Sequence, residues 1–370
     1  MHDYHVETIK LKSIEDIKED WLNLQERANC SYFQSWGWIG TWLKIVANDL
    51  TPILIKIISD DVTVGMGVFV SKNIKRHQVI KSEAVYLNEC PFNGRNMVIE
   101  YNGLLLAKGH EQEACAKTIQ SLYDNFEKNE EFVFSAITEE GYQQLRKNNN
   151  DNYGKLKLLE RSMTWSVDLG KINSKVDGYL SCLSKNRRAQ IRRSIKVYEE
   201  KSALVLVEAK NKDEALLYFD RLKELHTERW KIRKKKGSFA NPIWENFHRT
   251  LIESRFEEGE IQLIKVGNKE GAIGYLYNFI WRKHVYVLQT GFKMSDDKCL
   301  MPGYVTHVYA IAHNKEKGMD IYDLMHGDAL YKRILCNKIE VLYWAALQRK
   351  RLKFFLEDLA RTTIRKARGI

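Results

Sequence analysis

Residues 299–335 read CLMPGYVTHVYAIAHNKEKGMDIYDLMHGDALYKRIL, and this stretch decides the fold. Pro302 and Gly303 predict a helix start, because proline is favoured at the first helical position. The segment DIYDLMH predicts a short strand, and His326, Gly327 and Asp328 form a turn before a second helix. This order places two helix N-termini and one Asp/Lys pair at the end of a sheet. Such a place favours the binding of an anionic group.

The sequence on both sides of this stretch predicts antiparallel strands. Upstream, two helical segments at 213–230 and 242–259 precede strand-like segments at 261–266, 271–281 and 284–292. Nearer the N-terminus, residues 53–59 and 63–71 predict a β-hairpin around an Asp60-Asp61 turn, followed by further strands and a helix at 109–128. The repeated plan predicts an α+β fold of two related halves, residues 1–165 and 166–370.

Composition limits the class of protein. The chain has 370 residues, of which 44% are hydrophobic and 29% charged, and no apolar run is long enough to cross a membrane. The N-terminus lacks the apolar core of a signal peptide, so we expect a cytoplasmic protein. Six cysteines lie far apart without metal-ligand spacing, and we expect no metal.

The net charge of +11 is unevenly distributed. Basic residues gather at 185–201, at 229–236 and at 349–368. Such clusters attract polyanions, which include nucleic acid, phospholipid surfaces, nucleotide-linked substrates and coenzyme phosphates. The last cluster also predicts a basic amphipathic helix, which would allow peripheral contact with a membrane.

Two further segments have a marked pattern. SKNRRAQIRRS at 184–194 predicts an amphipathic helix, and its basic stripe includes Arg188 and Arg192. Near the N-terminus, Trp36, Trp38 and Trp42 are expected to pack in the core rather than to form a ligand platform.

Four motifs in this order resemble the GNAT acyltransferases. They are FQSWGWIGTW at 33–42, SKNRRAQIRRS at 184–194, MPGYVTHVYAI at 301–311 and YDLMHGDALYKR at 322–333. The chain is most similar to the BioF2-like or CelD-like acetyltransferase domains, which are related to the Fem-type aminoacyl transferases. The resemblance implies tandem GNAT-like domains with mixed, mostly antiparallel sheets flanked by helices. Residues 1–165 would be a degenerate copy.

The resemblance also implies site residues. In the family, backbone N–H groups at the start of the helix after the fourth strand bind the coenzyme A pyrophosphate. The matching segment here is Met301, Pro302, Gly303 and Tyr304. The family resemblance gives Arg188 and Arg192 a role in binding an anionic substrate, and we assign Tyr331 to the same substrate site.

Three residues are candidates for catalysis. Lys332 matches a functional lysine of the Fem-type enzymes and would stabilise an oxyanion. Asp328 would accept a proton from the attacking group, although it would also serve as a helix N-cap paired with Lys332. His326 has a suitable intrinsic pKa for the same task.

The resemblance favours transfer of an acyl group from acyl-coenzyme A to an amino or hydroxyl group, with no metal. The acceptor would be an anionic, nucleotide- or lipid-linked precursor of the envelope or of an exopolysaccharide. One alternative is aminoacyl transfer from transfer RNA, as in the Fem-type enzymes. Another is a non-catalytic binding protein on a GNAT scaffold, with a basic surface as its main feature.

Overall fold

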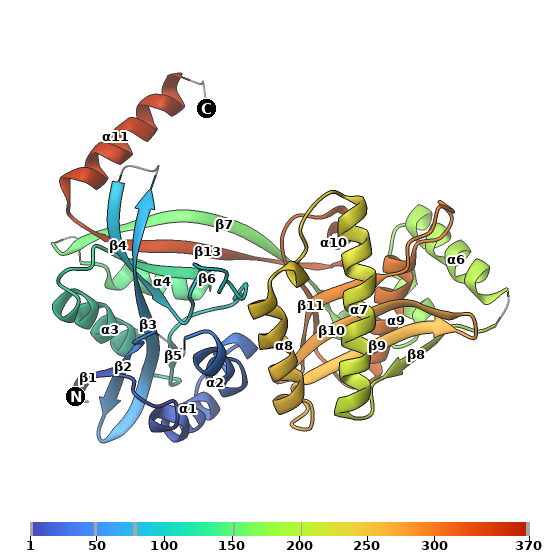
Figure 1. Ribbon diagram of the computed structural model, residues 1–370, viewed down its shortest axis with the longest axis horizontal. Helices are drawn as coiled ribbons and strands as arrows, with labels where there is room; N and C mark the ends of the chain where they lie inside the picture. The colour runs from blue at the N-terminus through green and yellow to red at the C-terminus, as the bar shows by residue number, and fades with distance from the viewer. Residues whose placement is uncertain (1–2, 48–49, 77–79, 151, 201, 368–370) are drawn as a thin grey trace. The chain divides into compact units, whose positions relative to one another are not determined.

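The computed structural model describes residues 3–47, 50–76, 80–150, 152–200 and 202–367 (Figure 1). Lys201 and Arg368, which belong to the predicted basic clusters, lie outside this description. The chain forms two compact units, Met1–Arg161 with Leu342–Ile370, and Ser162–Val341. The last residues therefore belong to the first unit, whereas the sequence analysis kept 166–370 together. That assignment missed the return of the chain because the final strand and helix follow the second half without a linker.

The first unit contains helices and strands in alternation. Its elements are β1 (Tyr4–Lys10), α1 (Glu15–Arg27), η1 (Tyr32–Gln34), α2 (Trp36–Ile45), β2 (Ile53–Ser59), β3 (Val62–Arg76), β4 (Ile80–Leu87), β5 (Leu105–Leu106), α3 (Glu111–Asn125), β6 (Glu131–Thr138), α4 (Glu139–Asn148), part of β7 (Gly154–Asp168), part of β13 (Lys338–Arg349) and α11 (Leu352–Ala367). The predicted hairpin is confirmed as β2 and β3. Asp60 and Asp61 at its turn have φ angles of 48° and 62°, which match the twist of the two strands.

The second unit contains the stretch that decides the fold. Its elements are the remainder of β7, η2 (Leu169–Lys171), α5 (Val176–Ser181), α6 (Lys185–Glu199), β8 (Val205–Glu208), α7 (Lys212–Ile232), η3 (Ser238–Ala240), α8 (Pro242–Arg255), β9 (Ile261–Asn268), β10 (Gly271–Trp281), β11 (His284–Phe292), α9 (Pro302–Glu316), β12 (Ile321–His326), α10 (Leu330–Leu335) and the start of β13. Its strands run in the order β7-β12-β11-β10-β9-β8. The predicted meander is confirmed as the antiparallel strands β9, β10 and β11.

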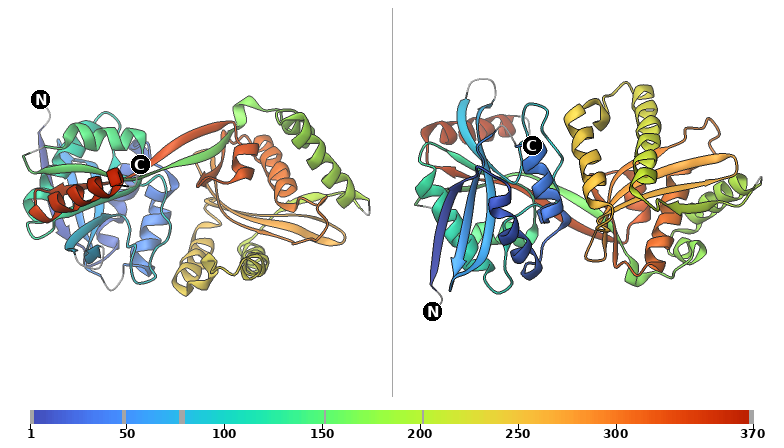
Figure 2. Two further views of the ribbon diagram at one scale, coloured as in Figure 1. Left: turned by 90° about the horizontal axis from the view of Figure 1, so that it is seen from above. Right: turned by 60° about the horizontal axis from the view of Figure 1, so that its bottom comes forward.

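Helices cover both faces of the strands of the second unit. Figure 2 shows α7 and α8 on one face and α9 with α6 on the other. Local sequence explains where the helices start: Asn211 caps α7, and Asn241 caps α8 just before Pro242. The predicted amphipathic helix at 184–194 is confirmed as α6, whose Ile191 is fully buried.

One parallel strand pair occurs in each unit, while the other pairings that the structure describes within the sheets are antiparallel. In the first unit β4 pairs with β6 from Ala84 and Glu131 to Tyr86 and Val133. In the second unit β11 pairs with β12 over an equally short stretch. Each parallel pair is connected by a helix, α3 or α9, which supports the predicted duplication.

The C-terminal segment forms the predicted amphipathic helix, α11, as far as its side chains are described. Phe354 is buried against the first unit, and Asp358 forms ion pairs with Lys155 and Lys157. The opposite face leaves large apolar side chains exposed, at Leu352, Phe355, Leu356 and Leu359. Contact with a membrane stays a prediction.

Tight packing between β10 and α9 gives a test of this fold. A methyl group added at Gly274 would lie 2.3 Å from Oγ1 of Thr306 and 2.9 Å from Cδ1 of Phe292. We therefore expect Gly274→Ala to lower the free energy of unfolding by about 1–3 kcal/mol. Adding Thr306→Ala removes the closest contact, so a double-mutant cycle by urea denaturation should show favourable coupling.

The matched control is Gly141→Ala in the first unit. Its nearest contact would be an ordinary 3.6 Å, so we expect a change within about 0.5 kcal/mol. Strictly additive losses for Gly274→Ala and Thr306→Ala would contradict the described packing.

Candidate functional site

The candidate site lies where β11 and β12 separate. Their parallel pairing runs from His284 and Ile321 to Tyr286 and Asp323 and then stops. Beyond that point β11 continues to Phe292, while β12 continues to His326 by pairing with β7 on its other edge. Backbone groups on the facing edges of the two strands therefore lack the ladder partners that a continuous sheet would supply, and they can bind a ligand.

The separation has a local cause in β12. The β12–β7 register shifts between Asp323 and His326, and Met325 has a φ of 67°, which is rare for a residue with a side chain. The Asp323 carboxylate, 1% exposed, accepts a hydrogen bond from the Met325 N–H at 2.6 Å. Its other oxygen lies 3.1 Å from Nε2 of His284. A buried carboxylate thus holds the unusual backbone of Met325.

Lys332 holds the same segment from α10. Its ammonium is buried, with 7% of the residue exposed, and donates to the carbonyls of Met325 and His326. The structure thus places Lys332 at the end of β12, where the sequence predicted it. These two hydrogen bonds to backbone carbonyls fix the end of the strand. A role in stabilising an oxyanion stays a prediction.

The predicted pair of Asp328 and Lys332 does not form. Helix α10 begins at Leu330 with Ala329 as its N-cap, so Asp328 lies before the helix and not on its face. The exposed Asp328 carboxylate instead accepts hydrogen bonds from Arg333. Arg333 lowers the pKa of Asp328, which makes its carboxylate a weaker base than an ordinary aspartate.

His326 ends β12, and the predicted turn follows it. Gly327 has a φ of 103°, and its N–H donates to the carbonyl of Met163 on β7. The glycine is needed here because a side chain would strain this backbone conformation. His326 is half-buried at the strand end, on the same segment as the carbonyls that Lys332 holds.

A cluster of uncharged aromatic side chains connects α9, β12 and α10. His307 on α9 is 1% exposed, its Nδ1 lies 2.9 Å from the Tyr322 hydroxyl, and its ring stacks on Tyr331 at 5.8 Å between centroids. Burial, together with the nearby charge of Lys332, lowers the pKa of His307 to about 3. Burial raises the pKa of Tyr331 to about 12, although Arg229 acts in the opposite direction. Both side chains are therefore uncharged at neutral pH.

Sequence analysis missed His307 and Arg229. His307 lies between apolar residues on a buried helix and gives no charge signal, while Arg229 was counted only as part of a basic cluster. The three-residue spacing of Tyr304 and His307 could have indicated His307, because it places the two side chains one turn apart on the same face of α9.

The start of α9 has the properties of an anion site. The first intrahelical bond runs from the Val305 N–H to the Met301 carbonyl, and among the described residues no side chain caps the helix. The Met301 N–H donates to Oγ of Ser194, which is fully buried on α6. The N–H groups of Gly303 and Tyr304 thus lie in the first turn, where an α-helix has no internal acceptors for them.

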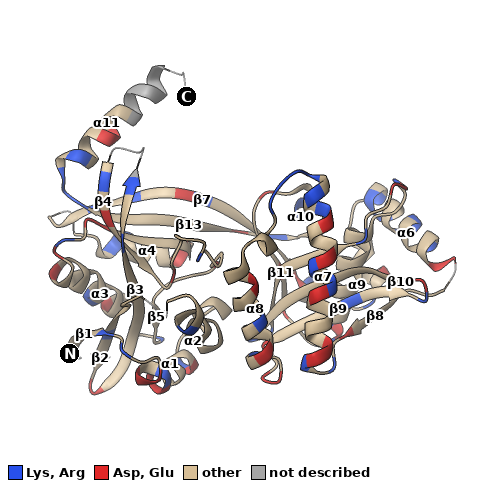
Figure 3. Ribbon diagram, in the orientation of Figure 1, with Lys and Arg blue, Asp and Glu red and all other residues tan. Residues whose placement is uncertain are grey.

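The arginine that reaches this helix start is not one of those predicted. Arg188 donates to the carbonyl of Ser181, and Arg192 forms an ion pair with Asp177. These contacts direct both side chains to α5. The Arg187 guanidinium instead lies over the ring of Tyr304, 5.2 Å from its centroid. Figure 3 shows the Lys and Arg residues along α6.

No group of three or more His, Cys, Asp or Glu side chains among the described residues is arranged to hold a metal ion. None of the described helices has the length and apolar character needed to span a membrane.

The low pKa of His307 predicts a pH dependence of stability. Between the ordinary value of 6.5 and about 3, the unfolded chain binds a proton at this side chain that the folded chain does not. Stability should therefore fall as the pH falls below 6.5. At pH 5 the contribution is about 2 kcal/mol. In His307→Gln we expect the loss of unfolding free energy between pH 7 and pH 5 to be smaller by this amount.

Urea denaturation at the two pH values measures this difference. The control His5→Gln removes an exposed histidine and should keep the wild-type dependence on pH. An unchanged pH dependence in His307→Gln would mean that His307 is protonated in the folded protein.

A family model described as an acetyltransferase (GNAT) domain matches residues 185–333. This range runs from the first residue of α6 to Arg333 and includes the strand separation, the start of α9 and Lys332. No curated protein matches the chain in sequence.

Solved structures share the fold over nearly the whole chain. FemX superposes with a TM-score of 0.60 at 11% identity, covering 91% of this chain and 96% of its own. The C-terminal domain of a putative lysylphosphatidylglycerol synthetase from Agrobacterium fabrum gives 0.55 at 10% identity, covering 95% and 97%. L-PGS from Bacillus licheniformis gives 0.53 at 12%, covering 95% and 96%. At these identities the likeness shows the fold, and it confirms the predicted α+β architecture. Residues 185–333 thus match the model of a GNAT acetyltransferase domain, in agreement with the resemblance of the motifs at 301–311 and 322–333, and this match supports an acyltransferase activity.

Proposed function

We propose that the protein transfers an acyl group from acyl-coenzyme A to an amino or hydroxyl group of an anionic acceptor. One observation carries this proposal: the separating strands β11 and β12 are connected by α9, whose start has no side-chain cap among the described residues and lies beside Arg187 of α6. The separated strands offer backbone groups to an acyl thioester, and the helix start offers N–H groups to phosphates.

The residues present fit coenzyme A. Met301, Pro302, Gly303 and Tyr304 would hold its pyrophosphate by backbone N–H groups, and Arg187 would add a guanidinium. Gly303 keeps the helix start close to Phe292, because an added methyl group would lie 3.2 Å from that ring. When bound, acyl-coenzyme A supplies an acyl group that is already activated as a thioester.

Within this proposal His326, and not Asp328, takes the proton of the attacking amine or hydroxyl. The Asp328 carboxylate is exposed and paired with Arg333, which lowers its pKa. Lys332 is a positioning residue, because it holds the two carbonyls at the end of β12. Tyr331 keeps its hydroxyl proton at neutral pH and so remains able to donate it.

The acceptor remains a prediction from charge. Exposed lysines follow α7 at Lys234, Lys235 and Lys236, and α6 carries further exposed cations. These favour a phosphorylated acceptor, such as a nucleotide- or lipid-linked precursor. The envelope or exopolysaccharide origin of the acceptor and the cytoplasmic location rest on the sequence resemblance and composition alone.

A second candidate is aminoacyl transfer from charged transfer RNA to such a precursor. The fold shared with FemX over 91% of the chain favours it, together with the net charge of +11. In that case the start of α9 would bind a phosphate of RNA rather than coenzyme A.

Ligand-induced stabilisation tests the donor. A ligand that binds only the folded state at a hundredfold excess over its dissociation constant adds about 2.7 kcal/mol. We expect acetyl-coenzyme A to raise the melting temperature of the protein. In Arg187→Ala the same rise should require at least three times the ligand concentration. Arg193→Ala, an exposed arginine on the same helix, is the matched control and should leave the shift unchanged.

Bulk transfer RNA is measured alongside. A shift with transfer RNA and none with any acyl-coenzyme A would replace the first proposal by the second. A shift with neither acyl-coenzyme A nor transfer RNA would contradict both proposed donors.

Kinetics tests the assignment of the base. We expect His326→Gln to lower kcat for the release of coenzyme A about 100-fold or more, which is typical for loss of a general base. Asp328→Asn should change kcat less than threefold. The reverse order of effects would restore Asp328 as the base and contradict the role given to His326.

A further inference from the structure

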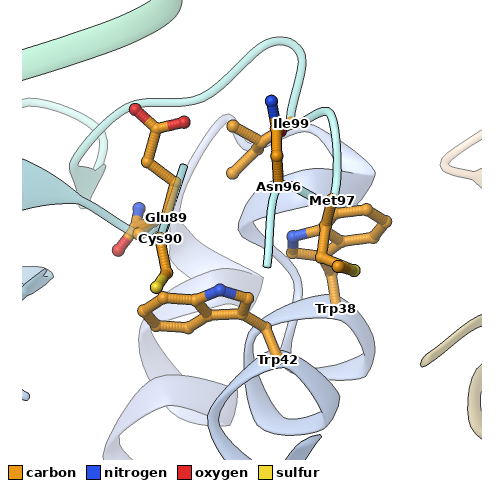
Figure 4. A pocket seen from close by; sticks show the side chains of 8 residues that line it. Trp38, Trp42, Glu89, Cys90, Asn96, Met97 and Ile99 are labelled. Atoms are coloured by element: carbon orange, nitrogen blue, oxygen red, sulfur yellow. The ribbon is translucent and has the colours of Figure 1, made fainter. Parts of the chain in front are cut away.

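Most large apolar side chains of the first unit are packed in its core. The indoles of Trp38 and Trp42 on α2, shown at a small pocket in Figure 4, belong to residues that are 0% and 1% exposed. Helix α11 departs from this pattern, because large apolar side chains on it lie in solvent. Their exposed fractions are 73% for Leu352, 64% for Phe355, 52% for Leu356 and 54% for Leu359.

These side chains form one stripe along α11. Their positions follow the spacing i, i+3, i+4 and i+7, which places them on one face of a helix. The other face packs against the first unit through Phe354, which is 4% exposed. A contiguous apolar stripe in solvent marks a surface that binds an apolar partner.

The charges of α11 favour an anionic partner. Its two acidic residues are held against the protein: Glu357 is 5% exposed, and Asp358 forms ion pairs with Lys155 and Lys157. Just before the helix, Lys350 and Arg351 are exposed. The sequence 361–367 adds three further cations and no acid. The helix thus offers apolar and positive groups to a partner, while its acids are already engaged.

A second group of cations lies beside the start of α11. The Lys353 ammonium donates to the Lys81 carbonyl at 2.6 Å, which joins the helix to the end of the β3–β4 hairpin. In that hairpin Lys75 and Lys81 stand directly opposite each other, and both are exposed. Neither forms an ion pair with a residue that the structure describes. Like charges directly opposite on a hairpin destabilise it, so a neutralising anion would be bound favourably there.

We propose that α11 and the adjoining end of the β3–β4 hairpin dock on an anionic phospholipid surface. The stripe from Leu352 to Leu359 enters the boundary between headgroups and acyl chains, and the cations lie at the level of the phosphates. The helix lies on the membrane, because its 16 residues are fewer than the roughly 20 that a spanning helix needs. This surface goes beyond the proposed acyl transfer and does not depend on it.

Charge and apolar area together distinguish this partner from two others. A second copy of the chain, paired through α11, would bring the cations of both copies together, and each chain already has a net charge of +11. Nucleic acid would pair with the cations but would leave the apolar stripe in water. A phospholipid surface satisfies both the stripe and the cations.

Flotation of the full chain with lipid vesicles tests the proposal. Vesicles of phosphatidylcholine and phosphatidylglycerol in equal parts are compared with vesicles of phosphatidylcholine alone. We expect binding to the anionic vesicles and at least tenfold weaker binding to the neutral ones, because several cations lie near the surface. High salt should weaken binding to the anionic vesicles. These measurements use the unaltered protein.

Substitutions in the stripe test its part in docking. Phe355→Ser combined with Leu356→Ser should weaken vesicle binding at least tenfold, because two apolar side chains no longer enter the lipid. Both side chains are exposed, so the fold should be kept. The control is Val62→Ser, which removes a 48% exposed apolar side chain at the opposite end of β3 from Lys75 and should leave binding unchanged.

Substitutions in the hairpin test the cations. Lys75→Gln combined with Lys81→Gln should weaken binding to the anionic vesicles and leave binding to the neutral ones unchanged.

Four results would overturn the proposal. They are absence of binding to the anionic vesicles, equal binding to both kinds of vesicle, unchanged binding when Phe355 and Leu356 are replaced, and an equal loss in Val62→Ser. A dimer in light scattering, or a complex with bulk transfer RNA, that the same double substitution dissociates would assign the stripe to that partner instead. None of these results affects the test of acyl-coenzyme A binding, which uses no vesicles.

Discussion

A parallel strand pair that separates after a short contact is the constraint on which the rest of the second unit depends. Strands β11 and β12 separate after their short pairing. The end of β12 keeps a defined path because Met325 is held in a left-handed conformation. Asp323 holds its N–H, and Lys332 holds its carbonyl. Both charged side chains are buried, and a buried charge is tolerated only when hydrogen bonds satisfy it. We infer that these two residues keep the strand ends in place for a ligand.

The two units use one arrangement with opposite chemistry. In the second unit the helix after the separating strand begins without acidic residues in its first turn and close to Arg187, which favours an anion. In the first unit the corresponding helix begins with two glutamates, and Glu89 follows the separating strand. A duplicated scaffold thus keeps its strand geometry, because that geometry depends on backbone pairing, while its ligand preference changes with a few side chains.

The sequence predicted the elements better than the contacts. The meander, the helix from Pro302, the short strand to His326 and the helix α6 follow from periodicity and from proline and glycine positions, which act locally. The pairing of Asp328 with Arg333 instead of Lys332 could not be predicted in this way, because α10 begins two residues later than predicted. Arg187 and Arg188 are neighbours in sequence, and only the packing of α6 against α9 decides which one reaches Tyr304. His307 escaped notice because its properties come from burial, which sequence alone does not reveal for a polar residue.

Hydrogen exchange with and without acetyl-coenzyme A tests the central claim most directly, since it reports on backbone N–H groups one segment at a time. The account predicts that the ligand slows exchange in the segment that includes the end of β11 and the first turn of α9, residues 287–305. The segment that follows β4 in the first unit, residues 86–103, should exchange as before. Slower exchange in the first unit alone, or in neither segment, would contradict the assignment of the strand separation between β11 and β12 as the acyl-coenzyme A site.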